Sequence, residues 1–303
     1  MRTGVDLGGS KIEALVLDPQ GREHARRRVP TPAGDYDGTV RSIVDLVHQV
    51  EAEAGCGATR VGMGIPGAVS PASGMIKNAN STWLIGRPFD RDLSKALQRP
   101  LRLANDANCF ALSEATDGAG AGADSVFGVI LGTGVGGGIV IKGSLHAGPD
   151  LIAGEWGHVP LPWPEPDDAM PPTCYCGKRG CIETHVSGPA LSRAHQQVTG
   201  DLLSPAQLEH RAADGDAAAE DSLRRYERAL AKALAMVITI LDPEVIVLGG
   251  GVSNLQRLYV NVPAMWSDYV FSDHVATQLL PARHGDSSGV RGAAWLWPGA
   301  PDQ

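Results

Sequence analysis

Three short glycine-rich segments each follow an apolar run that predicts a strand. They are Gly8-Gly9-Ser10-Lys11, Gly132-Thr133-Gly134 and Gly249-Gly250-Gly251. Glycine lets the backbone approach a ligand closely and aim several N–H groups at it, which suits a polyphosphate. The spacing fits neither a Walker sequence nor the dinucleotide fingerprint, because the first turn leads into a strand and not a helix. The three turns together predict a nucleotide-phosphate site of another type, to which the side chains of Ser10, Lys11 and Thr133 add donors.

Two aspartates stand next to predicted strand ends. Asp6 precedes the first turn in a strand expected to be buried, and we interpret it as an outer-shell ligand of Mg²⁺, which phosphate transfer from a nucleotide requires. The alternative is a carboxylate that caps its own turn. Asp106 follows Asn105 where a strand passes into a helix. It is either the helix N-cap or a general base that accepts a hydroxyl proton during attack on the γ-phosphorus.

A group of three cysteines and one histidine has the spacing of a metal site. Cys174, Cys176 and Cys181 lie within eight residues, and His158 lies upstream. A Cys₃His set predicts a tetrahedral structural zinc site with no open position, the alternative being a cluster of reduced thiols beside a core histidine. Glu155 and Glu183 flank these ligands, so the zinc would fix two carboxylates that can bind the hydroxyl groups of a sugar.

Composition limits the class of protein. The chain has 303 residues, a net charge of −8, 43% hydrophobic residues and five cysteines. Its scattered Lys and Arg residues argue against nucleic-acid binding. The N-terminus lacks a signal pattern and no window approaches the ~18 apolar residues of a spanning helix, so we expect a cytoplasmic protein without membrane contact.

The hydrophobic pattern predicts an α/β chain. The predicted strands are 2–7, 12–17, 24–29, 61–65, 101–104, 125–131, 139–142 and 245–248. The predicted helices are 39–54, 93–98, 107–114, 221–241 and 290–297. A stretch of small residues at 117–124 predicts a domain boundary, with lobes at 1–117 and 118–289.

The two halves repeat one pattern of strand, glycine-rich turn and strand. Leu7-Gly8 matches Leu131-Gly132 at an offset of 124 residues, and residues 15–17 fall on 139–141 at the same offset. Glycine turns between strands are common, but the shared offset favours a duplication in which two lobes hold one ligand.

Motifs spread over nearly the whole chain resemble the ROK family of sugar kinases. They are DLGGSK at 6–11, GIPG at 64–67, NDAN at 105–108, GTGVGGG at 132–138, EWGH at 155–158, CYCGKRGCIE at 174–183 and LGGG at 248–251. Residues 77–94 and 282–298 are most similar to the bacterial fructokinases, also called manno(fructo)kinases. The resemblance implies an actin-like, ribonuclease-H-like ATPase fold with a cleft between two α/β lobes, the first completed by a helix at 290–303.

The resemblance also implies roles for individual residues. Asp106 would be the catalytic base, and His158 would bind both zinc and sugar. The other expected sugar contacts are Gly67, Asn80, Asn105, Glu155 and Glu183. The turns at 8–11 and 132–134 would hold the phosphates of ATP, and Gly249 to Gly251 would lie near the adenosine. Ser10 departs from the Thr of many members but keeps the hydroxyl.

These features predict an ATP-dependent hexose kinase that phosphorylates fructose at O6, and mannose as well. The alternatives are a glucokinase or an N-acetylglucosamine kinase, and a catalytically silent sugar-binding regulator. Family members are usually homodimers. The repressors among them carry a DNA-binding domain before the first turn, where this sequence has seven residues before Gly8.

Overall fold

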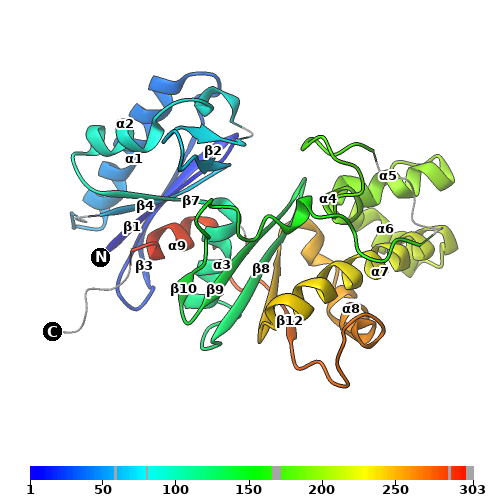
Figure 1. Cartoon of the computed structure of the whole chain (residues 1–303). Coiled ribbons are helices and arrows are strands. Elements are labelled where there is room, and N and C mark those ends of the chain that lie inside the picture. Colours follow the sequence, from blue (N-terminus) through cyan, green and yellow to red (C-terminus); the bar gives the residue numbers. More distant parts are fainter. Residues whose placement is uncertain (58–59, 80, 166–171, 286–287, 298–303) are drawn as a thin grey trace. The chain divides into compact units, whose positions relative to one another are not determined.

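The chain begins with the β-hairpin that its apolar pattern predicts. In the computed structural model, β1 (Arg2–Leu7) pairs antiparallel with β2 (Lys11–Leu17) across the Gly8-Gly9 turn (Figure 1). The structure describes residues 1–57, 60–79, 81–165, 172–285 and 288–297. None of the helices in these ranges is long and apolar enough to cross a membrane.

Two five-stranded sheets organise the chain and confirm the predicted α/β class. The first sheet has the order β3 (Glu23–Pro30), β2, β1, β4 (Val61–Ile65) and β7 (Leu101–Asn105). The second has the order β10 (Ser144–Leu145), β9 (Val135–Ile141), β8 (Ser125–Leu131), β11 (Val245–Gly249) and β12 (Gln278–Pro281). In the first, β1, β4 and β7 are parallel, and in the second β8, β11 and β12 are parallel. The equivalent orders agree with the duplication inferred from the repeated pattern.

Helices and short strands complete the secondary structure. The α-helices are α1 (Tyr36–Glu53), α2 (Phe89–Leu97), α3 (Asp106–Thr116), α4 (Glu183–Val186), α5 (Gly188–Thr199), α6 (Pro205–Ala213), α7 (Ala217–Leu241), α8 (Leu258–Ala264) and α9 (Ser288–Trp295). The 3₁₀ turns are η1 (Thr82–Leu84), η2 (Trp156–His158), η3 (Gly251–Asn254) and η4 (Trp266–Asp268). Strands β5 (Ala68–Val69) and β6 (Ile76–Lys77) form a small antiparallel pair.

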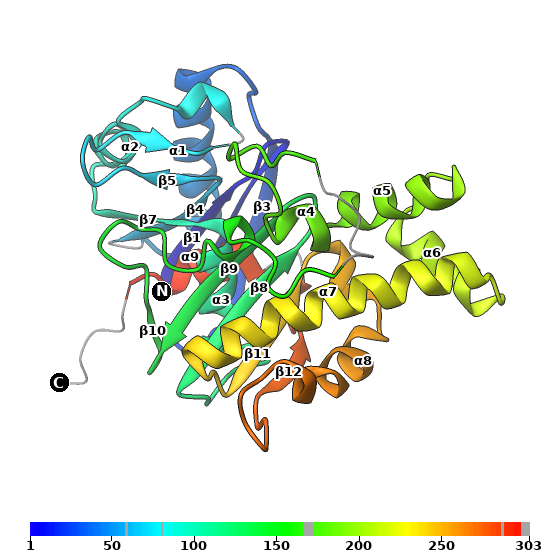
Figure 2. The ribbon, with the colours of Figure 1, turned by 45° about the vertical axis from the view of Figure 1, so that its right-hand side comes forward.

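The chain divides into two compact units. The first holds Met1–Gly122, Gly138–Ala153 and the residues from Arg283 onward, and the second holds Ala123–Gly137 and Gly154–Ala282. This division differs from the predicted lobes in three segments, because residues 118–122, 138–153 and 283–289 lie with the first unit. In the second unit, α7 packs with α4, α5, α6 and α8 (Figure 2).

Helices cover both faces of the first sheet, with α1 and α2 on one face and α3 and α9 on the other (Figure 1). Successive residues of β2 point to opposite faces, so Ala14 and Val16 join the core under α1, while Leu15 and Leu17 pack against Val290 and Ala294 of α9. The helix that follows residue 282 therefore packs on strands formed by the first residues of the chain.

The close approach of α9 requires glycine on the neighbouring elements. A Cβ at Gly62 of β4 would lie 1.8 Å from the Ala293 carbonyl oxygen. A Cβ at Gly292 would lie 1.7 Å from the Cys109 carbonyl oxygen on α3. Any side chain at either position would therefore push α9 away from the sheet or from α3.

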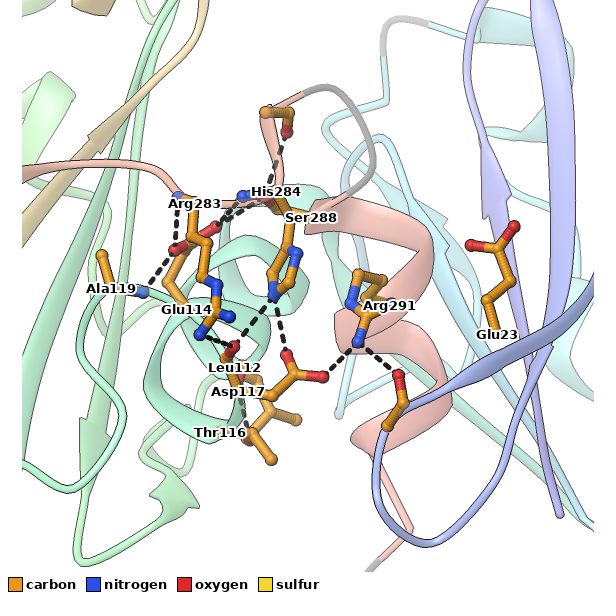
Figure 3. A network of polar contacts seen from close by, with 12 residues as sticks. Glu23, Leu112, Glu114, Thr116, Asp117, Ala119, Arg283, His284, Ser288 and Arg291 are labelled. Atoms are coloured by element: carbon orange, nitrogen blue, oxygen red, sulfur yellow. Dashed lines mark hydrogen bonds and ion pairs between the residues drawn. The ribbon is translucent and has the colours of Figure 1, made fainter.

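A buried carboxylate fixes the segment that leads into α9. The Glu114 side chain is fully buried and accepts hydrogen bonds from the backbone N–H groups of Ala119, Arg283 and His284, at 2.9, 3.0 and 3.2 Å. It also accepts one from the Ser288 hydroxyl at 2.8 Å, as Figure 3 shows. Nearby, Asp117 pairs with Arg291 and with His284.

We expect Glu114→Ala to lower the free energy of unfolding by roughly 3 kcal/mol or more, because it leaves several buried donors without an acceptor. Urea and thermal unfolding measure this loss. The matched control is Glu53→Ala, since among the described residues Glu53 forms an exposed ion pair with Arg27, worth about 0–1 kcal/mol. Equal unfolding midpoints for the two variants would contradict the role given to Glu114.

Candidate active site

The first glycine-rich turn is held by backbone hydrogen bonds. The Gly8 N–H donates to the Lys11 carbonyl at 2.9 Å, and the Thr31 hydroxyl donates to the Gly8 carbonyl at 2.8 Å. Gly9 and Ser10 are exposed. The turn is thus fixed at its base by hydrogen bonds and exposed at its tip, at Gly9 and Ser10.

Asp6 lies at the end of β1 beside two glycines. A Cβ at Gly64 of β4 would stand 3.0 Å from Asp6 Oδ1, and one at Gly289 of α9 would stand 3.1 Å from Asp6 Oδ2. Both neighbouring elements therefore leave space around this carboxylate that larger residues would fill.

The surroundings of Asp6 disfavour its negative charge. Its pKa is raised to about 7, first by burial and then by the charges of Asp106 and Glu13, against the opposing charge of Lys11. A carboxylate in this position gains stability from a bound cation. The site thus fits the Mg²⁺ predicted for Asp6, for which the carboxylate would be an outer-shell ligand.

Asn105 and Asp106 lie where β7 passes into α3. Asn105 is the N-cap, since its side chain accepts the Ala107 N–H at 2.8 Å. The alternative that Asp106 is the N-cap is therefore wrong. Asp106 is the first helical residue, is exposed, and its Oδ1 also accepts the Ala107 N–H at 2.8 Å.

Parallel strands bring these side chains to one edge of the first sheet. In register, Asp6 stands beside Gly64, and Gly64 beside Ala104, so β1, β4 and β7 end together. Gly67, just after β4, adopts a φ of +99° and accepts a hydrogen bond from the Asn105 side chain at 3.5 Å. The structure thus brings together Asp6, Gly67, Asn105 and Asp106. Asn80 lies outside the described residues.

The second unit has an equivalent edge. The Gly132 N–H donates to the Gly134 carbonyl at 3.0 Å, and Thr133 is exposed between them. Glu183, at the start of α4, accepts the Val135 N–H at 2.9 Å. The predicted sugar carboxylate and the predicted phosphate turn are thus directly connected.

The third glycine turn lies beside the second. Gly249 ends β11 paired with Ile130, and Gly250 has a φ of +84°. A Cβ at Gly250 would lie 2.4 Å from the Leu131 carbonyl oxygen. Packing between the turns therefore requires the middle glycine, whereas a Cβ at Gly251 would meet nothing within 4 Å.

The predicted metal ligands come together in the second unit. The ligand atoms of His158, Cys174, Cys176 and Cys181 all lie within 4.8 Å of one another. The Cys176 and Cys181 sulfurs are 3.6 Å apart, and tetrahedral zinc with Zn–S bonds of ~2.3 Å would hold them about 3.8 Å apart. The Cys174 sulfur lies 3.5 Å from His158 Nδ1. The donor set and its spacing fit zinc.

Glu155, which was expected in the site, directly precedes η2 and is exposed. Two other residues, Tyr175 and Thr31, were not singled out from the sequence. Tyr175 stands between two of the predicted cysteine ligands, and its hydroxyl lies 2.8 Å from His158 Nε2. Thr31, which braces the first turn, gave no signal at all, because it lies over twenty residues from that turn in the sequence.

Comparison with known proteins identifies the family. A family model described as the ROK family matches residues 2–300. N-acetyl-D-glucosamine kinase from Pectobacterium atrosepticum is 39% identical over 300 residues, or 98% of each chain. The enzyme of the same name from Pasteurella multocida is 39% identical over 302 residues, covering 98% of this chain and 99% of its own.

Comparison with solved structures identifies the same family. ROK hexokinase from Thermus thermophilus superimposes with a TM-score of 0.87 at 32% identity, over 97% of each chain. A ROK family glucokinase from Streptomyces griseus, in complex with glucose and AMPPNP, gives a TM-score of 0.75 at 31% identity, over 97% of this chain and 98% of that one. The fold is thus the predicted actin-like α/β fold, and the chain belongs to the ROK family as one of its sugar kinases.

Proposed function

We propose that this chain transfers the γ-phosphoryl group of ATP to O6 of N-acetyl-D-glucosamine. The observation that carries the proposal is the 39% identity to N-acetyl-D-glucosamine kinases over 98% of the chain. The sequence motifs favoured fructose, but the similar proteins described above favour the alternative substrate. In the cell, we propose a cytoplasmic homodimer whose partners are the sugar and ATP.

At two positions of the glycine turns, neither the backbone conformation nor the packing of the fold requires a glycine, and this supports phosphate binding there. Gly9 has no positive φ, and a Cβ there would meet nothing within 4 Å. For Gly132 the nearest atom to an added Cβ is 4.0 Å away. Since neither position needs glycine for conformation or packing, we infer that a ligand approaches the backbone there.

Asp106 would act on the sugar hydroxyl. Its carboxylate accepts the O6 proton as O6 bonds to the γ-phosphorus, while the bond from that phosphorus to the leaving oxygen of ADP breaks. Asp6 would be an outer-shell ligand of Mg²⁺, which would neutralise charge on the phosphate oxygens. Lys11 and the N–H groups of both phosphate turns would hold the phosphates, and Asn105, Glu155 and Glu183 would orient the sugar.

A sugar panel tests the substrate. We expect ATP consumption to depend on added sugar, with kcat/KM for N-acetylglucosamine at least about tenfold above glucose, mannose and fructose, because an unpaired polar group in the site costs transition-state binding. Coupled ADP detection measures it. A preference for fructose would restore the fructokinase interpretation, and no sugar-dependent consumption would support the silent regulator.

The base is tested by Asp106→Asn. We expect kcat to fall at least ~10²-fold while sugar binding stays close to that of the wild type, because the amide cannot accept the proton. Asp37→Asn is the matched control, since Asp37 is also an exposed aspartate in a first helical turn, that of α1. A kcat near the wild-type value in Asp106→Asn would remove Asp106 from the mechanism.

The metal is tested by elemental analysis and by chelation. We expect about one zinc per chain, and we expect strong chelation to lower both the unfolding temperature and activity. Cys176→Ser should lose the zinc, whereas Cys56→Ser should retain it, because Cys56 lies outside the cluster. Active wild-type protein without zinc would show that the assignment is wrong.

A further inference from the structure

Helix α7 carries a lysine inside the core of the second unit. The Lys232 side chain is fully buried, and its neighbours in the helix, Ala231 and Ala233, are buried as well. A buried charge is costly unless it is paired, and an apolar residue of similar volume often packs equally well in its place. Core packing alone therefore does not explain a lysine at this position.

Two partners of Lys232 lie on the segment 159–165, which directly follows η2. The Lys232 Nζ donates to the Trp163 carbonyl oxygen at 2.8 Å and pairs with Glu165 Oε1 at 2.8 Å. Arg228, one turn earlier in α7, lies 3.3 Å from the other carboxylate oxygen of Glu165. Lys232 thus holds this segment on the helix through both a backbone group and a side chain.

The same segment is paired with the loop that carries the predicted cysteine ligands. The Leu161 N–H donates to the Gly180 carbonyl at 2.8 Å. The Ile182 N–H donates to the Val159 carbonyl at 2.9 Å. These two hydrogen bonds lie on either side of Cys181, so the position of the segment sets the position of this predicted zinc ligand.

Helix α7 also holds the chain beyond the cysteine ligands. The buried Tyr226 hydroxyl donates to the Val186 carbonyl at 2.8 Å, and α4 packs on α7. The three predicted cysteine ligands lie between Trp163 and Val186 in the sequence, and His158 lies shortly before Trp163. Buried polar side chains of one helix thus hold the chain on both sides of these cysteines.

We propose that Lys232 is a positioning residue of the zinc site. Its buried ammonium group fixes the segment after η2 on α7, and thereby keeps His158 and Cys181 within reach of one metal ion. Because Glu183 directly follows the cysteine-bearing loop, the same contacts also hold a carboxylate that is predicted to bind the sugar. The inference rests on the zinc site proposed above, but not on which sugar is phosphorylated.

The test is Lys232→Met, which removes the charge and keeps most of the volume. We expect a colorimetric chelator to remove zinc about tenfold faster than from the wild type, since altered outer-shell partners weaken metal sites roughly 10–100-fold. With zinc present, the unfolding temperature should stay close to the wild-type value. The reason is that Met packs well in this space, while the Glu165 carboxylate, 39% exposed, remains partly solvated.

The control and two further variants stand on or beside the same helix. Arg225→Met is the matched control, because Arg225 also lies on α7 but pairs within the helix, with Asp221. Tyr226→Phe removes a single hydroxyl at the second contact and should also speed zinc release. The double variant Lys232→Met/Glu165→Gln should release zinc no faster than Lys232→Met, since both changes break the same ion pair.

Equal release rates for zinc-bound wild type and Lys232→Met would overturn this inference alone. Faster release from Arg225→Met as well would assign the effect to a general loosening of α7, and would also contradict it. If Lys232→Met does not fold, Tyr226→Phe and Glu165→Gln decide, and unchanged release from both would overturn the inference. Wild-type protein without zinc would instead refute the zinc site itself, and with it this role of Lys232.

Discussion

The docking of α9 on the first sheet is the contact on which the candidate site in the first unit depends. The helix approaches so closely that Gly62 and Gly292 have no room for a side chain. Glu114 accepts hydrogen bonds from Arg283 and His284, which precede the helix, and from Ser288 at its start. As a result, Gly289 in the first turn of α9 lies against the Asp6 carboxylate, which connects the packing of the core to the electrostatics of the proposed magnesium site.

The two sheets share one arrangement at the edge that carries the glycine turns. In each, an antiparallel hairpin with a glycine turn stands beside parallel strands that end at the same edge. Backbone N–H groups at such edges and turns are natural phosphate donors, and the adjacent strand ends supply the chemistry-bearing side chains. In the second unit, the Glu183 carboxylate accepts a hydrogen bond from the N–H of Val135, the residue after the turn, so a shift of the loop that carries the predicted metal ligands would also displace this hydrogen bond.

Much of this arrangement could be predicted from the sequence, because strong periodicity marks strands buried in a sheet and the metal ligands cluster in the chain. The start of β9 could not, because Gly136, Gly137 and Gly138 suggest a turn. A Cβ at Gly137 would lie 2.7 Å from Trp156, so tertiary packing selects this glycine within a strand. Helix α6 did carry a local signal, since Ser204 and Gln207 form a capping box before weak amphipathic residues. Substrate preference depends on single hydrogen bonds, which spacing in the sequence does not encode.

The first unit is assembled from segments at opposite ends of the polypeptide. Because α9 is the last of the described elements in the sequence, β1 and β4 leave the ribosome long before the helix that covers them exists. The apolar face of these strands therefore stays without its α9 cover until that helix has been synthesised. A chain that stops before residue 288 would therefore leave Asp6 and Asp106 on a sheet without its α9 cover.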